Sequence, residues 1–191
     1  MINNMEYSLD IRNNERNLIE AIINKERWAQ KQLYESYYGS LMAICMRYSE
    51  SEREAEDILH ESFMKIFNNI NKYKTGTSLK SWMSRIVVNT SIDHYRRRSR
   101  NKTVDLDGVY HLKTKEPSVL EKISAEEIIS AMHQMTMMYR TIFNMFVVEG
   151  FSHKDIAKKL GISESTSRSN LVKARKKLKQ ILLSKDKFYD R

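Results

Sequence analysis

The stretch GFSHKDIAKKLGISESTSRSNLVKARKKL, residues 150–178, decides the fold of the C-terminal part of the chain. Ser152, followed three residues later by Asp155, is typical of a capped helix start. Gly161 permits a sharp turn, and Ser163 is a good N-cap for a second helix. The apolar positions that the two helices would bury are Ile156, Ala157, Leu160, Leu171, Ala174 and Leu178. Two helices joined by a tight turn that contains glycine predict a helix-turn-helix.

The second helix of this motif has residues that suit contacts to DNA. In a helix-turn-helix, the N-terminal residues of the second helix face base edges in the major groove. The positions predicted to be exposed there are Glu164, Ser165, Ser167, Arg168, Ser169, Val172 and Lys173. Arg168 can donate two hydrogen bonds to a guanine, and serines suit phosphate or base contacts. Positive charge continues along the helix at Arg175, Lys176, Lys177 and Lys179. A basic helix that only faces solvent is the alternative, but the serine caps and the glycine turn favour DNA binding.

Towards the N-terminus, residues 17–98 show apolar side chains at helical spacing. Three stripes recur: Leu33, Tyr37, Leu41, Ile44, Tyr48; then Ala55, Ile58, Leu59, Phe63, Ile66, Phe67, Ile70; then Leu79, Trp82, Met83, Ile86, Val87, Thr90. Residues 74–78 interrupt the pattern, with Gly76 suited to a turn and Ser78 to an N-cap. Each stripe must be buried against another helix, so the spacing predicts a small helical bundle with a short additional N-terminal helix.

The interruptions in the pattern divide the chain into four parts. Residues 1–16 are polar and aperiodic and are expected to form a flexible N-terminal arm, and residues 17–100 form the helical bundle. Residues 101–117 lose the helical period and contain Gly108 and Pro117, which is typical of a linker; residues 118–191 form the C-terminal domain. The chain has 5 glycines and 1 proline, fewer than strand-rich folds use in turns. We therefore predict an all-α protein: two small helical domains joined by a flexible linker, the C-terminal one a helix-turn-helix.

Composition points to an anionic partner. The formal net charge is +9, which favours nucleic acid or an anionic membrane surface. No run of about 18 apolar residues and no signal-peptide core is present, so we expect a cytoplasmic protein without membrane insertion. The single cysteine, Cys45, lies in an apolar helical pattern and is expected to be a buried thiol.

An acidic stretch reverses this charge locally. It comprises Glu50, Glu52, Glu54, Glu56, Asp57 and Glu61, and Arg53 alone opposes it. Such a surface repels DNA and is better suited to contact another protein. Favourable placement of carboxylates near the start of a helix is the alternative explanation.

A basic stretch, IDHYRRRSR, occupies residues 92–100. Four arginines among aromatic groups at a helix end can hold phosphates and stack bases. A cationic helix end that interacts with the helix dipole is the alternative, but one or two arginines would suffice for that.

Two separate parts of the chain carry sets of motifs. Residues 17–100 contain LYxxY at 33–37, EAEDILHESF at 54–63, SWMxRIxVN at 81–89 and DHYRRR at 93–98. Residues 119–182 contain YR at 139–140, GFSxxDIA at 150–157, LGIS at 160–163 and RSxLxxAR at 168–175. The first set resembles the second conserved region, and the second set the fourth region, of the small two-domain extracytoplasmic-function (ECF) sigma factors. The two parts occur in the order that the family has, with a linker of suitable size.

The resemblance implies a transcription initiation factor that binds core RNA polymerase and promoter DNA. Contacts to the polymerase clamp helices would come from Glu56, Asp57, Glu61 and Phe63. Contacts to the minus-ten element, including a pocket for a flipped base near Asn89, would come from Tyr73, Lys74, Lys80, Asn89, Arg96, Arg97, Arg98 and Arg100. Contacts to the minus-thirty-five element would come from Ser165, Thr166, Arg168, Ser169, Val172, Lys173 and Arg175. The polymerase flap and an anti-sigma factor are further partners that the resemblance implies.

Two other functions compete with this interpretation. A stand-alone helix-turn-helix regulator would explain the C-terminal domain, but neither the acidic stretch nor the arginines after Asn89. An enzyme is disfavoured because the sequence has no metal-spaced Cys/His cluster, no glycine-rich phosphate loop and no nucleophile motif. We therefore expect no catalytic residues, no metal and no cofactor.

Overall fold

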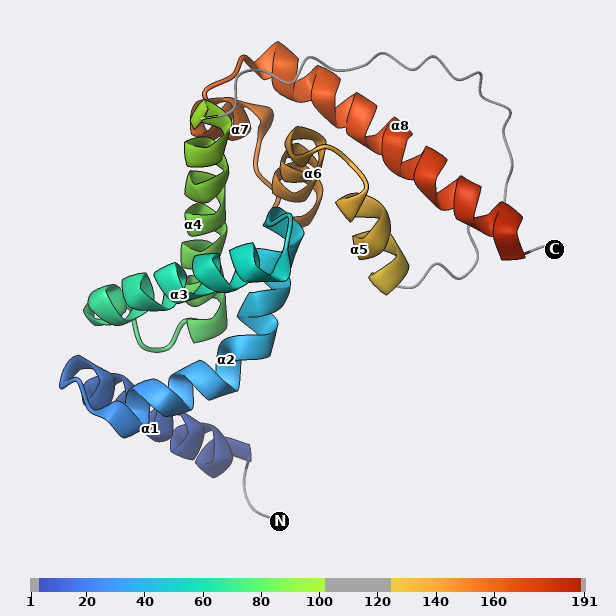
Figure 1. Cartoon of the computed structure of the whole chain (residues 1–191). Helices are drawn as coiled ribbons and strands as arrows, with labels where there is room; N and C mark the ends of the chain where they lie inside the picture. Colours follow the sequence, from blue (N-terminus) through green and yellow to red (C-terminus); the bar gives the residue numbers. More distant parts are fainter. Residues whose placement is uncertain (1–3, 102–124, 190–191) are drawn as a thin grey trace. The chain divides into compact units, whose positions relative to one another are not determined.

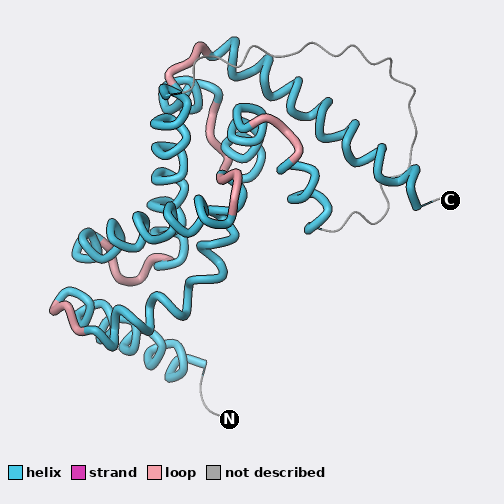
Figure 2. Tube along the Cα trace, in the orientation of Figure 1, coloured by secondary structure: helices cyan, strands magenta, loops and turns pink. Residues whose placement is uncertain are grey.

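The computed structural model describes residues 4–101 and 125–189, and it describes side chains over residues 14–100 and 127–184. These residues form helices and connecting loops without a strand (Figure 2). In chain order the elements are α1 (Asn4–Ile23), α2 (Arg27–Tyr48), α3 (Glu52–Asn69), η1 (Ile70–Lys72), α4 (Leu79–Asn101), α5 (Ala125–His133), α6 (Met137–Phe143), η2 (Asn144–Val148), α7 (His153–Leu160) and α8 (Glu164–Tyr189), as labelled in Figure 1. The predicted all-α class is confirmed.

The chain divides into two compact units, residues 1–91 and residues 92–191, and the division falls inside α4. The predicted linker, residues 101–117, lies almost entirely in the stretch 102–124, outside the described residues. The domain boundaries at residues 100 and 117 therefore remain predictions.

In the first unit, α2 and α3 pack against each other, and α1 packs on α2 and η1. The three predicted apolar stripes supply most of the core, and Ile22 of α1 adds to it. The largest buried side chains are Ile22, Leu33, Leu41, Tyr48, Ile58, Leu59, Ile66 and Met83. Cys45 is fully buried, as predicted, and burial raises the pKa of its thiol to about 12.

The predicted N-terminal arm differs from the structure. Residues 4–16 belong to α1, the helix that Ile19 and Ile22 anchor in the core. The stretch contains no glycine or proline, so nothing in its backbone stops the anchored helix from continuing towards the N-terminus.

The predicted break in the apolar pattern at residues 74–78 is a loop in the structure. Gly76 has φ +91°, in the left-handed region that favours glycine. The Ser78 hydroxyl accepts a hydrogen bond from the Ser81 backbone N–H at 3.2 Å. Ser78 therefore caps the start of α4, as predicted.

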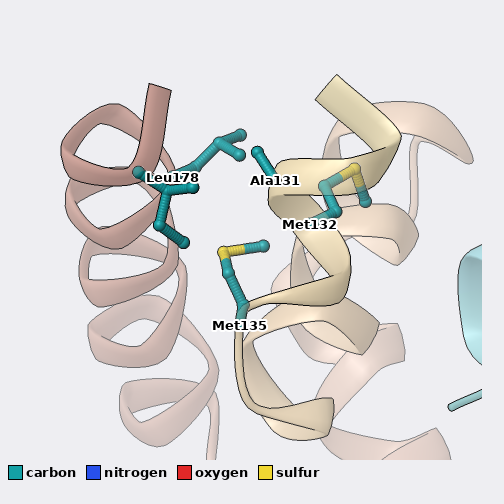
Figure 3. Close-up of a cluster of buried hydrophobic side chains, with 5 residues drawn as sticks. Ala131, Met132, Met135 and Leu178 are labelled. Carbon is teal, nitrogen blue, oxygen red and sulfur yellow. The ribbon is translucent and has the colours of Figure 1, made fainter. Parts of the chain in front are cut away.

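In the second unit, α5, α6 and α7 all pack against the long helix α8. Ala131 of α5 and Met135, in the turn that follows α5, lie opposite Leu178 of α8 (Figure 3). Met132 and Ile181 are buried in the same cluster. This apolar contact holds α8 by its central turns and leaves its N-terminal turns for the helix-turn-helix.

Candidate nucleic-acid interface

The caps and the turn predicted for the helix-turn-helix of residues 150–178 are confirmed. The Ser152 hydroxyl accepts a hydrogen bond from the Asp155 N–H at 3.1 Å and so caps α7. Gly161 ends α7 with φ +70°. The Ser163 hydroxyl accepts from the Thr166 N–H at 3.0 Å and caps α8. Local side-chain chemistry thus fixes both ends of the turn.

Burial fixes which face of α8 points outward. Its buried positions are Ser167, Leu171, Ala174, Leu178 and Ile181, spaced by four, three, four and three. Because a helix repeats every 3.6 residues, these positions form one face. Of the predicted contacts to the minus-thirty-five element, Thr166 is half-buried and the remainder are exposed: Ser165, Arg168, Ser169, Val172, Lys173 and Arg175.

Ser167 was expected to be exposed, and this prediction is wrong: the residue is fully buried. It lies one helical step before Leu171 in the buried face, and its hydroxyl is 2.9 Å from Nδ1 of His153. The small serine therefore fills the contact between α7 and α8.

His153 is a residue of this site that the sequence reasoning did not single out. Its ring stacks on Phe146, with centroids 4.4 Å apart and an interplanar angle of 24°. The Arg175 guanidinium carbon lies 5.9 Å from the centroid of Phe146. Desolvation first, and then the charge of Arg168, lower the pKa of His153. His153 thus joins η2, α7 and α8 beside the predicted DNA-contacting residues, and only its place just after the Ser152 cap marked it in the sequence.

Arg168 forms an ion pair within α8. Its Nη2 lies 3.1 Å from Oε2 of Glu164, one helical turn earlier, and both side chains are largely exposed. Exposed pairs at this spacing stabilise a helix only weakly. The guanidinium can therefore exchange this carboxylate for a base edge at small cost.

The acidic stretch divides between capping and an exposed face. The Glu54 carboxylate accepts from the Glu50 N–H at 2.6 Å, and the Glu54 N–H donates to the Ser51 hydroxyl at 3.2 Å. Glu54 therefore stabilises the start of α3. This agrees with the alternative explanation of the acidic stretch, in which carboxylates lie near the start of a helix. Glu56 and Asp57 are exposed.

Two other residues predicted to contact the polymerase are less exposed than Glu56 and Asp57. Glu61 is half-buried and forms a 2.8 Å salt bridge with Lys65. Phe63 is only 2% exposed, and its ring centroid lies 4.6 Å from that of Tyr34. Phe63 follows Leu59 in the buried stripe of α3, as its place in the apolar pattern predicts, and its part in polymerase binding stays a prediction.

Tyr73, predicted to contact DNA, is also buried, at 7% exposure. Its hydroxyl lies 2.6 Å from the Glu15 carboxylate and 2.5 Å from the Thr77 carbonyl, and its ring packs beside Trp82. Burial and the Glu15 hydrogen bond raise its pKa to about 12. Tyr73 supports the loop that precedes α4 and does not present its ring for stacking. Lys74, in that loop, and Lys80, in the first turn of α4, are exposed.

Helix α4 presents polar groups along its length. Asn89 is exposed, and its neighbour Thr90 is buried against α3 through a 3.2 Å hydrogen bond from Lys65. In the last turns of the helix, Arg97 and Arg100 are exposed, whereas Arg96 and Arg98 are half-buried. Arg96 approaches Asp93 at 4.0 Å.

Two further observations concern the described residues, 4–101 and 125–189. No helix among them is long and apolar enough to cross a bilayer. In the same parts of the chain, no three His, Cys, Asp or Glu side chains gather in a way that would hold a metal ion.

Comparison with known proteins gives two matches to family models. Residues 33–101 match Sigma-70 region 2, and residues 125–178 match Sigma-70, region 4. Together the two matches span more than half of the 191 residues.

Individual relatives match over most of their length. The chain is 26% identical over 165 residues to the ECF RNA polymerase sigma factor SigM of Mycobacterium tuberculosis, covering 86% of this chain and 83% of that protein. It is 23% identical over 152 residues to the ECF RNA polymerase sigma factor SigM of Bacillus subtilis, covering 78% and 93%. A solved structure of the sigma factor RpoE in complex with the anti-sigma factor NepR from Bartonella quintana has 25% identity and a TM-score of 0.47, covering 80% of this chain and 95% of that one. The two matched regions, together with the two SigM relatives, show that the chain belongs to the sigma-70 family, as an ECF RNA polymerase sigma factor.

Proposed function

We propose that this protein binds core RNA polymerase and directs it to promoters, where the protein contacts DNA and initiates transcription. The strongest support is that two separate faces of the protein carry opposite charge. The exposed carboxylates Glu56 and Asp57 lie on α3 of the first unit, whereas the outward face of α8 is cationic. An acidic face repels DNA and a cationic face attracts it, so the two faces suit different partners.

The protein-binding role belongs to the outward face of α3. Glu56 and Asp57 would contact the clamp helices of the polymerase, and Phe63 would support them from the core together with Tyr34. Glu61 would contribute less than the sequence suggested, because Lys65 already neutralises part of its charge.

DNA contacts are assigned to two elements. In α4, Asn89 would serve the minus-ten element, and Arg96, Arg97, Arg98 and Arg100 would hold phosphates near it. Lys80, in the first turn of α4, and Lys74, in the loop before it, would add contacts to the same element. In α8, the exposed residues from Ser165 to Arg175 would face the minus-thirty-five element. Tyr73 would act indirectly, by holding the loop to Glu15 and Thr77.

A cytoplasmic location follows from this function, since polymerase and promoters are found there. The polymerase flap and an anti-sigma factor remain partners that the family resemblance predicts.

Charge reversals test the assignment of polymerase binding to α3. Wild-type protein and the double variant Glu56→Lys, Asp57→Lys would be mixed with core polymerase and separated by size. We expect the wild type to comigrate and the double variant to lose comigration. Glu20→Lys, which reverses an exposed carboxylate on α1, is the matched control and should comigrate like the wild type. Unchanged comigration of the double variant would contradict the assignment of α3.

A stand-alone regulator gives a different result in a second assay. It would bind a specific duplex tightly without polymerase, whereas a sigma factor of this architecture needs the polymerase to place its two DNA-contacting units together. Tight, sequence-specific binding by the free chain would therefore favour the regulator.

A further inference from the structure

One aliphatic side chain interrupts the polar outward face of α8. Val172 is 67% exposed, more than any other large hydrophobic residue in the described parts of the chain. Its neighbours in sequence set its direction, because Leu171 and Ala174 are buried and so fix the rotation of the helix. A β-branched residue gains little in an exposed helix position, since it loses side-chain freedom without burying surface.

The surroundings of Val172 are those of the predicted DNA contact. Ser165, Arg168, Val172, Lys176 and Lys179 are spaced by three, four, four and three residues, so they form one stripe along α8. All five are exposed, and Val172 is central in the stripe. The apolar group thus lies among donors and cations that suit the edges of bases and the phosphates on either side of a groove.

We propose that Val172 contacts the C5-methyl group of a thymine and so makes the protein select thymine at one position of the minus-thirty-five element. This inference rests on the proposed function, in which α8 enters the major groove. In that groove the thymine methyl is the one apolar group that a base presents, and aliphatic side chains recognise it by contact.

The position of Val172 relative to Arg168 predicts where the thymine lies. Four residues of helix advance about 6 Å along the helix axis. Successive base pairs are about 3.4 Å apart. The thymine read by Val172 should therefore lie about two base pairs from the base that Arg168 reads.

Other exposed valines supply a matched control. Val147 and Val148 of η2 are 47% and 50% exposed, comparable in size and chemistry, but they precede the helix-turn-helix and are not on α8. The substitution Val148→Ala removes the same atoms from the same domain and leaves the stripe on α8 unchanged.

The experiment replaces each thymine of a responsive minus-thirty-five element, one at a time, with deoxyuridine, which lacks only the methyl group. Binding of the complex of core polymerase and protein to each duplex is then measured for the wild type, Val172→Ala, Val172→Thr and Val148→Ala. Val172→Thr keeps the branched shape and replaces one methyl group by a hydroxyl. Thermal unfolding of each variant shows whether the exposed substitutions leave the fold intact.

We expect one thymine at which deoxyuridine weakens wild-type binding about three- to fourfold, the effect of losing one buried methyl group. Val148→Ala should keep this sensitivity, Val172→Thr should reduce it, and Val172→Ala should abolish it. Equal binding to every deoxyuridine duplex, or sensitivity that persists in Val172→Ala, would overturn the inference while leaving the proposed function intact. If the complex did not select promoter DNA at all, the proposed function itself would fail.

Discussion

Replacement of Arg168 by alanine should relax the sequence preference of the protein at one base pair of the minus-thirty-five element. In the structure, Arg168 is paired only with the exposed Glu164 at 3.1 Å. Such a pair contributes about 0.3–0.5 kcal/mol, so its loss on binding DNA is a small cost. A bidentate contact to guanine discriminates against other bases by about 1–3 kcal/mol. The variant should therefore lose between about fivefold and 150-fold of discrimination at that position.

The assay measures the affinity of the protein, bound to core polymerase, for a set of duplexes that differ by single base pairs. Arg168→Lys keeps the charge but lacks the planar fork, so it should lose nearly as much discrimination as Arg168→Ala. Glu164→Ala frees the guanidinium and should change the preference little. Lys177→Ala, an exposed cation outside the Arg168 stripe, is the control and should keep the preference.

A phosphate contact would give a different result. Arg168→Ala would then weaken binding to all duplexes equally, and the salt dependence of the logarithm of affinity would decrease by about 0.9 for the lost phosphate contact. Arg168→Lys would restore most of the binding. That combination would refute the assignment of Arg168 as a residue that reads a base.

Three further predictions concern the other parts of the site. Asn89→Ala, at an exposed position of α4, should weaken promoter opening but leave polymerase affinity unchanged; equal losses in both measurements would contradict its placement at the minus-ten element. Ser163→Ala removes the hydroxyl that caps α8 and should lower the free energy of unfolding of the C-terminal unit by about 1 kcal/mol, measured by denaturant titration, with Ser184→Ala as a control away from the cap. Burial lowers the pKa of both His133 and His153 below the ordinary 6.5, so the folded state binds protons less readily than the unfolded state. Stability should be full above pH 6.5 and should fall as the pH drops through the lowered pKa values; His153→Gln should flatten the dependence, and stability that rises on acidification would contradict it.

The sequence was sufficient for most of the helices and for their caps, because these depend on short-range chemistry, but it missed the part of α1 that precedes residue 17. The hydroxyls of Ser78, Ser152 and Ser163 cap helices where the sequence places them, and Gly76 and Gly161 adopt the left-handed conformation. The apolar stripes could also be predicted, because the helical spacing of their residues places them on one side of each helix, and that side is buried.

The sequence was insufficient where a residue's environment comes from another element. Ser167 belongs by type to a DNA-contacting surface, but packing against His153 buries it. Tyr73 is buried because Glu15, 58 residues earlier, bonds to its hydroxyl. No local sequence pattern predicts such contacts between distant residues. The role of His153 could not be predicted for the same reason.

The most direct test of the central claim is run-off transcription with purified core RNA polymerase on fragmented DNA from the source organism, with and without this protein. We predict discrete new transcripts that depend on the protein, whose aligned start sites share upstream elements and whose yield falls in the Glu56→Lys, Asp57→Lys variant. If no protein-dependent transcripts appear, and the protein does not comigrate with core polymerase, the claim that it is a promoter-directing subunit is contradicted.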